Sequence, residues 1–192
     1  MSRLHQGAHA SGIPRKNRMA MRLRQEDASS PFTGTFAMAY RITGLSPDLF
    51  THLWALDDAA LAAQSIRRVV ADKDRGFPCR VSLDDARAGE SLLLLPFQHH
   101  EVAGPYRAGG PIFVRQQATR AAVFEDRIPE AFLRRLLSVR AYDAEGWMQA
   151  AEVVEGTQLE PLIASFFQRD DVAYLHVHNA RPGCFAARVD RH

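Results

Sequence analysis

The chain has 192 residues, of which 46% are hydrophobic, and a formal net charge of +2 at pH 7. This length and composition predict one domain with a full core, plus a tail. No apolar run approaches the roughly 20 residues that a membrane helix needs, and residues 1–34 lack the apolar centre of a secretory signal. We therefore expect a cytoplasmic protein without a membrane partner.

The N-terminal segment differs from the rest of the chain. Residues 1–30 carry six basic side chains against two acidic ones, so the remaining residues have a net charge of −2. We expect residues 1–36 to be a basic, disordered tail or an over-extended gene start, and residues 37–192 to form a single α+β domain. Two alternatives are a nucleic-acid-binding arm, although aromatic residues are not interleaved, and an arginine-rich organelle targeting peptide. Nucleic-acid binding by the remaining residues is not expected.

Several segments are strand-like because they are short, rich in apolar or β-branched residues, and bounded by turn residues. One of them contains Pro96, which cannot donate a backbone hydrogen bond and so indicates a sheet edge or a bulge. The predicted strands are residues 38–45, 66–72, 79–83 and 91–100, one or two strands within 111–124, a hairpin over 138–154, and a C-terminal hairpin.

Four helices are predicted from capping residues and apolar spacing. Ser46 and Asp57 are typical N-terminal caps of two short helices. Pro129 opens a third helix, and its predicted apolar face consists of Phe132, Leu133, Leu136 and Leu137. Thr157 and Glu160 predict a capping box for the clearest helix. The apolar side chains of that helix recur at helical spacing and are Leu159, Leu162, Ile163, Phe166 and Phe167.

These elements predict an α+β fold with a mainly antiparallel sheet, open or barrel-like, and helices packed on one face. The strands follow one another through turns and short loops, as antiparallel strands do. Regular alternation of strands and helices is missing, which argues against a doubly wound fold. The sequence contains no GxxxxGK[ST] motif and no GxGxxG after a strand. Nucleotide chemistry of those kinds is therefore not expected.

The C-terminal hairpin gathers most of the side chains that are suited to chemistry. Alternation predicts a core face formed by Leu175, Val177, Phe185, Ala187 and Val189. A five-residue loop over 179–183 keeps these apolar residues on one side, whereas a four-residue loop would turn Arg188 toward the core. The resulting register sets His178 opposite Cys184, His176 opposite Ala186, and Tyr174 opposite Arg188.

Three blocks of the sequence resemble a known bacterial family. The blocks FPCRVSLDDARAGESLLLLPFQHH, GPYRAGGPIFVR and VAYLHVHNARPGCFAARVDR are similar to those of the family called domain of unknown function 1203. The resemblance covers about residues 39–191 and leaves the basic segment outside. It implies a small, single-domain bacterial protein, and it implies no activity, substrate or catalytic residue.

A divalent metal site is one interpretation of the histidines. His176 and His178 share one face of a strand, and such a pair can present two imidazoles to zinc or iron. His99 or His100 would be a third ligand and Cys184 a fourth. No nearby glutamate completes the pattern of two histidines and a glutamate found in cupins. The alternative is that the histidines only satisfy hydrogen bonds among aromatic neighbours.

Thiol catalysis is a second interpretation. Cys79, then His176 or His178, then Asn179 follow the order of a nucleophile, a base and an orienting residue. Cys79 lies in a strand-like segment, however, whereas thiol nucleophiles commonly use a helix N-terminus. The alternative is that Cys79 and Cys184 are two small buried residues in a reducing compartment.

Recognition of a small polar or anionic molecule is the third interpretation. Arginine forks suit carboxylate or phosphate groups, and tyrosine, histidine and asparagine can add hydrogen bonds. The candidate ligand-binding residues are Tyr106, Arg107, Arg115, Tyr174, Asn179, Arg181, Cys184 and Arg188. The glycine-rich loop 101–111 could act as a mobile lid. The alternative is that these arginines pair with surface acids.

We expect a small-molecule-binding protein with one polar pocket, formed by the final hairpin, the His99 region and the glycine-rich loop. As an enzyme, it would use His176 or His178 as a general acid or base. The rival hypothesis is a non-catalytic interaction module in which the same residues only stabilise the fold. A concave pocket with at least three of the candidate side chains favours the first hypothesis, and a filled, hydrogen-bonded core favours the second.

Overall fold

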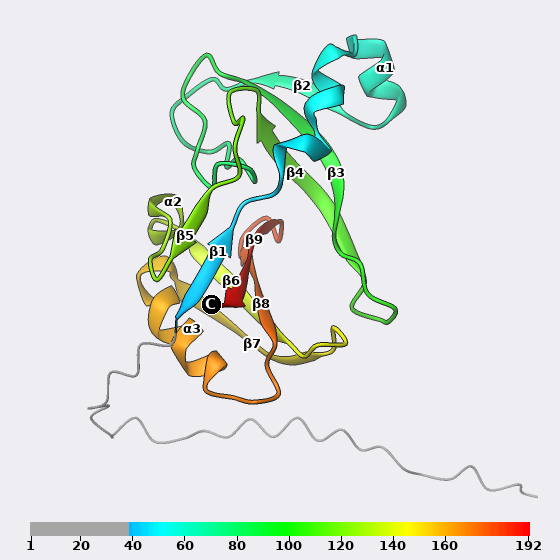
Figure 1. Cartoon of the computed structure of the whole chain (residues 1–192). Coiled ribbons are helices and arrows are strands. Elements are labelled where there is room, and N and C mark those ends of the chain that lie inside the picture. The colour runs from blue at the N-terminus through cyan, green and yellow to red at the C-terminus, as the bar shows by residue number, and fades with distance from the viewer. Residues whose placement is uncertain (1–38) are drawn as a thin grey trace, which may run out of the picture. The chain divides into compact units, whose positions relative to one another are not determined.

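The computed structural model describes residues 39–192, which form two antiparallel sheets and several short helices (Figure 1). The strands are β1 (Tyr40–Thr43), β2 (Arg67–Val70), β3 (Ser91–His100), β4 (Ala108–Arg115), β5 (Val123–Glu125), β6 (Leu136–Tyr142), β7 (Met148–Glu155), β8 (Tyr174–Asn179) and β9 (Phe185–Arg191). The helices are η1 (Pro47–Leu49), η2 (Thr51–Ala55), α1 (Asp58–Ala63), α2 (Glu130–Leu133), η3 (Gly156–Gln158) and α3 (Leu159–Phe167). In this part of the chain no helix has both the length and the apolar character that a membrane span requires. The predicted basic tail, residues 1–36, lies outside the described residues.

The larger sheet has six strands in the order β5-β1-β9-β8-β6-β7, and all neighbouring strands are antiparallel. Because β5 and β7 are its edges, the sheet is open and does not close into a barrel. One face packs against α2 and α3, where Phe132, Ile163 and Phe167 contact the apolar face of the central strands. The α+β fold class, with a mainly antiparallel sheet and helices on one face, is therefore confirmed.

The smaller sheet has the order β2-β3-β4 and covers a second apolar core. Pairing of β2 with β3 ends at Leu94, and further along β3 Pro96 lies opposite Pro111 of β4. Neither proline can donate a hydrogen bond, and β2 no longer flanks the strand there, so the predicted edge at Pro96 is confirmed. A register shift between Gln98 and His100 then leaves His99 outside the regular pairing.

The predicted strand over residues 79–83 is wrong. Cys79 forms only an isolated bridge to Phe113, and the chain then turns, with the Leu83 N–H donating to the Cys79 carbonyl at 3.0 Å. Arg80 and Val81 are both buried, so consecutive side chains do not alternate between core and solvent as in a half-buried strand. This turn carries Arg80 into the interior.

Each of the four predicted helices has a counterpart among the six of the structure, but some of the predicted bounds are wrong. Ser46 and Asp57 cap η1 and α1 as predicted, because their side chains accept hydrogen bonds from Asp48 N and Ala60 N. The helix after Pro129 ends at Leu133. Its predicted apolar residues Leu136 and Leu137 begin β6 instead, since the following residues pair with both β7 and β8.

The apolar face predicted for residues 159–167 is present on α3, with Leu162 only partly buried. The capping box of Thr157 and Glu160 is absent, because the chain enters α3 through η3 and Gln158 precedes the helix without a side-chain cap. Gly156 lies close to Phe132 of α2, and its N–H donates to the carbonyl of Arg135, just after that helix, at 2.8 Å, which accounts for this entry.

The C-terminal hairpin forms, but its register differs from the prediction. Asn179 N donates to Cys184 O at 3.0 Å and Gly183 N donates to Asn179 O at 2.8 Å, so the loop has four residues, 180–183. The observed partners are His178 with Phe185, His176 with Arg188, and Tyr174 with Asp190, in place of Cys184, Ala186 and Arg188.

A β-bulge explains why a four-residue loop does not turn Arg188 into the core. Val177 pairs with Ala187 and His178 with Phe185, so Ala186 is an extra residue in β9. The core face therefore contains Leu175, Val177, Ala187 and Val189, as predicted. Phe185 lies beyond the bulge and turns to the opposite face, where it joins the histidines.

Candidate functional site

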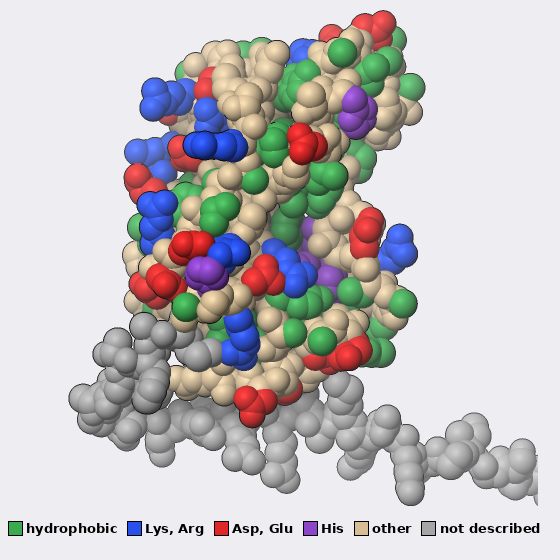
Figure 2. Space-filling model, in the orientation of Figure 1, with side chains coloured by type: hydrophobic (Ala, Val, Ile, Leu, Met, Phe, Trp, Pro, Cys, Tyr) green, Lys and Arg blue, Asp and Glu red, His purple; other side chains and the backbone are tan. Residues whose placement is uncertain are grey.

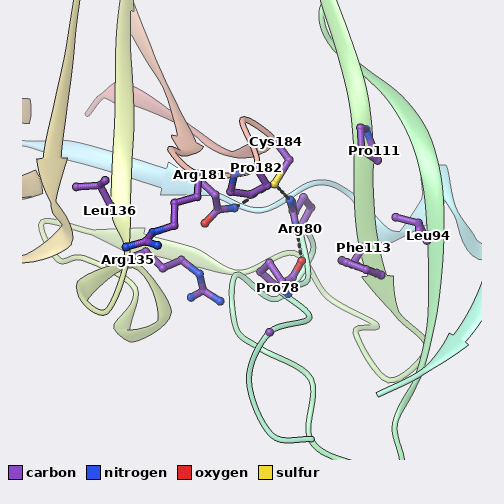
Figure 3. Close-up of a pocket in the computed structure, with 12 residues that line it drawn as sticks. Pro78, Arg80, Leu94, Pro111, Phe113, Arg135, Leu136, Arg181, Pro182 and Cys184 are labelled. Atoms are coloured by element: carbon purple, nitrogen blue, oxygen red, sulfur yellow. Dashed lines mark hydrogen bonds between the residues drawn. The ribbon is translucent and has the colours of Figure 1, made fainter. Parts of the chain in front are cut away.

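The structure divides the predicted single pocket into two cavities. The first, which we call the histidine cavity, has a volume of about 310 Å³ and includes His99, His176, Tyr174 and Arg188 among its lining residues. Figure 2 shows histidine side chains recessed in a hollow of the surface, beside hydrophobic and basic side chains. The second, which we call the arginine cavity, has a volume of about 350 Å³ (Figure 3). Its lining includes Arg80, Asn179, Arg181 and Cys184.

The histidine cavity brings together side chains from two sheets. His176 and His178 alternate with the core residues of β8, so both project from the face opposite α3. His99 lies at the irregular end of β3, where its ring stacks on Phe185 at a centroid distance of 4.9 Å. Each of the three histidines offers a ring nitrogen, and these nitrogen atoms all lie within 4.8 Å of one another.

The hydrogen bonding of these three rings leaves nitrogen atoms free. His178 Nδ1 lies 3.1 Å from the Gly183 carbonyl. Because a carbonyl only accepts, Nδ1 carries the proton and Nε2 keeps its lone pair. Among residues 39–192, His178 Nε2, His176 Nδ1 and His99 Nδ1 are buried and have no hydrogen-bond partner. Buried polar atoms are normally satisfied, so three orphaned nitrogens in one cluster need an explanation.

Burial also keeps these histidines uncharged. Burial, and to a smaller extent the positive charge of nearby Arg140, lowers the pKa of His99 and of His178 to about 4. Burial, and to a smaller extent the neighbouring histidines, lowers the pKa of His176 to about 2. Near neutral pH all three rings are neutral imidazoles, which is the form that binds metal ions.

His100 behaves differently from the other three histidines. Its Nδ1 lies 2.7 Å from the Tyr106 carbonyl and its Nε2 lies 2.7 Å from the Tyr174 hydroxyl. Nδ1 therefore donates, and Nε2 accepts from the tyrosine. Both nitrogens of His100 are occupied, as expected of a histidine that only satisfies hydrogen bonds. His99 is therefore the better third metal ligand beside His176 and His178.

Arg188 and Tyr174 form one wall of the histidine cavity. The Arg188 guanidinium lies over the Tyr174 ring, with its carbon 3.9 Å from the ring centroid, and Arg188 Nε donates to Asp190 Oδ1 at 2.7 Å. The predicted direct pairing of these residues across the hairpin is replaced by this diagonal contact. About half of the Arg188 side chain remains exposed, and the ion pair with Asp190 compensates its charge.

Three of the candidate ligand-binding residues line neither cavity. Arg107 is exposed, and Arg115 Nη2 forms an ion pair with Glu90 at 2.8 Å. Tyr106 packs edge-on against Trp147 and uses its carbonyl to bind His100. The structure therefore places Arg115 with an acid, as the alternative interpretation expects, and Tyr106 beside the histidine cavity as a support.

The proposed cysteine triad is not assembled. Cys79 is buried, and its sulfur accepts hydrogen bonds from the backbone N–H groups of Val81 and Arg115. Cys184 lies in the arginine cavity, where Arg80 Nη2 and Asn179 Nδ2 donate to its sulfur at 3.0 and 3.4 Å. Neither cysteine belongs to the histidine cluster among the described residues.

Arg80 is the main site residue that the sequence analysis missed. Its side chain is buried, with Nε donating to the Phe185 carbonyl at 2.7 Å and Nη1 donating to the Pro78 carbonyl. The available signal was its position inside the apolar block FPCRVSL. A charged residue within such a block is either at the surface or buried with partners, and only the fold shows which.

The fold and the two cavities define an α+β protein with two antiparallel sheets and a cluster of three histidines, two of them buried. Residues 76–191 match the family model described as "Protein of unknown function (DUF1203)". The match covers more than half of the chain, so the protein belongs to this family, as the sequence blocks indicated. No curated protein and no solved structure matches the chain. The three histidines and Arg80 all lie within the matched residues.

Proposed function

We propose that this protein binds a divalent transition metal, zinc or iron, through His99, His176 and His178, and that the metal holds a small polar molecule in the histidine cavity. The observation that carries the proposal is the set of three neutral imidazoles, two of them buried and that of His99 half-buried, whose nitrogens lie within 4.8 Å of one another. Nitrogen ligands of a tetrahedral zinc ion are about 3.3 Å apart. Small side-chain rotations would therefore close the site.

Three histidine ligands leave a position open on the metal. In zinc proteins this number of ligands is typical of sites that bind water or substrate. A metal in this position would polarise an oxygen atom bound to it. The adjacent Arg188 pairs with Asp190 through Nε, and its remaining N–H groups favour a ligand with hydrogen-bond acceptors.

The Gly183 carbonyl supports this assignment of His178. It holds the Nδ1 proton of His178, and this contact orients the ring with Nε2 available as the ligand atom. Such outer contacts are typical of metal-binding histidines. The hairpin loop therefore connects β8 to β9 and also sets the orientation of the His178 ring.

We favour the ligand role of the histidines over general acid–base catalysis. A general base works best when its pKa lies near the working pH. The pKa values of His176 and His178 are lowered to about 2 and about 4, chiefly by burial. Neither ring would exchange a proton efficiently near neutral pH without a bound metal.

We further propose that the protein works in the cytoplasm of a bacterium. Both cysteines are free thiols, which suits a reducing compartment. The family resemblance implied a bacterial source. The partner is then a small cytoplasmic molecule that enters the histidine cavity.

Zinc titration tests the metal site. The chain purified without chelator should bind one equivalent of Zn²⁺, and free zinc at 100 times Kd should raise the free energy of unfolding by about 2.7 kcal/mol. His176→Phe keeps an aromatic ring without nitrogen atoms and should abolish binding, whereas His52→Ala, at an exposed position of η2, should bind as the parent does. A parent chain that binds no zinc, or an unchanged His176→Phe variant, would refute the site.

Cobalt tests the open position on the metal. Co²⁺ in place of zinc gives a visible absorption spectrum that reports the coordination of the ion. Adding azide should change that spectrum if one position is open to the cavity. A spectrum that stays constant at high azide concentration would show a closed, structural site instead.

A further inference from the structure

The arginine cavity is independent of the proposed metal site. It lies between the turn at residues 76–80, the strands β3 and β4, and the loop of the C-terminal hairpin (Figure 3). None of its lining residues lines the histidine cavity. Any ligand of this cavity therefore binds without contact to the histidine cluster.

Arg80 places an uncompensated positive charge in the wall of this cavity. Its side chain is 2% exposed. Three of its five N–H groups reach the Phe185 carbonyl, the Pro78 carbonyl and the Cys184 sulfur, and no carboxylate pairs with it among the described residues. Burying a guanidinium without a negative partner is costly. Two N–H groups and the whole charge remain available to an anion.

Two further arginines line the same cavity. Arg135 is neutralised by Asp85, which lies 2.5 Å from its Nη2 atom. Arg181 forms no ion pair and no side-chain hydrogen bond within residues 39–192. The cavity therefore has three guanidinium groups close to it and one carboxylate that compensates one of them. This excess of positive charge points to an anionic ligand.

The remaining walls of the cavity are apolar. Leu94, Pro111, Phe113 and Leu136 line it opposite and beside the arginines (Figure 3). An inorganic anion would leave these surfaces in contact with water, whereas an apolar group would bury them. The volume of about 350 Å³ falls at the lower end of the range for small-molecule sites.

We propose that the arginine cavity binds an organic carboxylate with an apolar body, such as an aryl or branched alkyl group. The carboxylate pairs with Arg181 and with the free N–H groups of Arg80, since planar guanidinium and carboxylate groups match in geometry. The apolar body lies against Leu94 and Phe113. Cys184, which accepts a hydrogen bond from Arg80, lies beside the bound carboxylate.

Cys184 supplies a reporter for this proposal. It is partly exposed in the cavity, whereas Cys79 is only 1% exposed. Alkylation of Cys184 by iodoacetamide, followed by mass spectrometry, should slow at least fivefold in the presence of saturating phenylacetate. Phenylacetamide has the same body without the charge, and phosphate has charge without the body. Neither should protect the thiol at the same concentration.

Arginine variants locate the carboxylate. Arg181→Gln should weaken phenylacetate binding about tenfold, since one charged hydrogen-bonded pair is lost. Arg169→Gln is the matched control, because Arg169 pairs with Asp171 at the surface and lines neither cavity. Calorimetric titration of phenylacetate into Cys184→Ser gives a second measurement that does not depend on thiol reactivity.

Each other outcome contradicts the proposal in a recognisable way. Equal protection by phenylacetamide would show a purely apolar cavity, and equal protection by phosphate would show a general anion site. No binding by calorimetry, or an unchanged Arg181→Gln variant, would remove the carboxylate site. His176→Phe should lose zinc and keep phenylacetate binding, so failure of one site is distinguished from failure of the other.

Discussion

At the residue scale, Arg80 joins two segments that are distant in the sequence. It is held between the turn that contains it and β9, through the carbonyls of Pro78 and Phe185. Its buried charge opposes folding, whereas its hydrogen bonds to buried acceptors favour it. Because each buried acceptor left without a partner costs about 1–3 kcal/mol, we expect the hydrogen bonds to outweigh the charge.

Arg80→Met tests this balance. The variant should lower the free energy of unfolding by about 2 kcal/mol, measured by urea denaturation, because two carbonyls lose their donor. Arg107→Met is the control at an exposed position and should change stability by less than about 0.5 kcal/mol. An Arg80→Met variant more stable than the parent would show that the buried charge dominates.

Phe185 is the residue whose role the bulge changes most. It stacks on His99 with an interplanar angle of 10° and packs edge-on against His176. Phe185→Ala should cost about 3–5 kcal/mol as a large truncation, and it should also weaken zinc binding because His99 loses its support. Phe185→Leu should cost less than about 1.5 kcal/mol. Denaturation and zinc titration measure the two effects, and unchanged zinc affinity in Phe185→Ala would rule out the supporting role.

At the element scale, the contact between α2 and η3, the entry to α3, depends on glycine at position 156, which has no side chain. A Cβ atom added to Gly156 would lie 1.9 Å from the Phe132 carbonyl oxygen and 2.8 Å from Leu133 Cα. Backbone atoms cannot move aside as a flexible side chain can. The two helices can therefore approach this closely on one face of the large sheet only with glycine at position 156.

Gly156→Ala should destabilise the protein by about 3 kcal/mol, because the elements must separate or the backbone must distort. Gly110→Ala is the matched control in β4, where an added Cβ would meet no atom within 4 Å. The control should change the thermal midpoint by no more than a degree or two. Equal midpoints for the two variants would contradict the predicted clash.

At the scale of the whole molecule, the histidine cluster makes stability depend on pH. In the unfolded chain histidines titrate near pH 6.5, while burial lowers the pKa of His99, His176 and His178 to about 4, 2 and 4 in the folded protein. At pH values between the lowered pKa values and pH 6.5, these histidines bind more protons in the unfolded state than in the folded state. The free energy of unfolding therefore falls as the pH falls below about 6.5.

Urea denaturation of the metal-free protein between pH 7 and pH 5 measures this effect. The midpoint should fall steadily over that range, where most carboxylates remain ionised. His176→Phe should show a shallower dependence, since one proton-binding group of the unfolded state is gone. Identical slopes for the parent and the variant would show that His176 does not contribute to the acid response.

The sequence by itself determined the fold class and the content of the two faces of β8. Both depend on local periodicity, which is why Leu175 and Val177 lie in the core and His176 and His178 lie opposite. The capping residues Ser46 and Asp57 were also predictable, because a cap involves neighbours within three residues. The domain boundary near residue 36 stays a prediction.

Only the tertiary structure decided how the candidate side chains divide between two cavities. His99 approaches His176 and His178 because β3 reaches the large sheet, and Arg80 reaches Phe185 across 105 residues of sequence. The hairpin loop has four residues, and without the bulge at Ala186 it would turn Ala187 and Val189 of β9 away from the core. The local pattern of apolar and polar residues determines which face of a strand a side chain occupies. Contacts between distant segments determine which side chains meet, and a single sequence carries no local signal for those contacts.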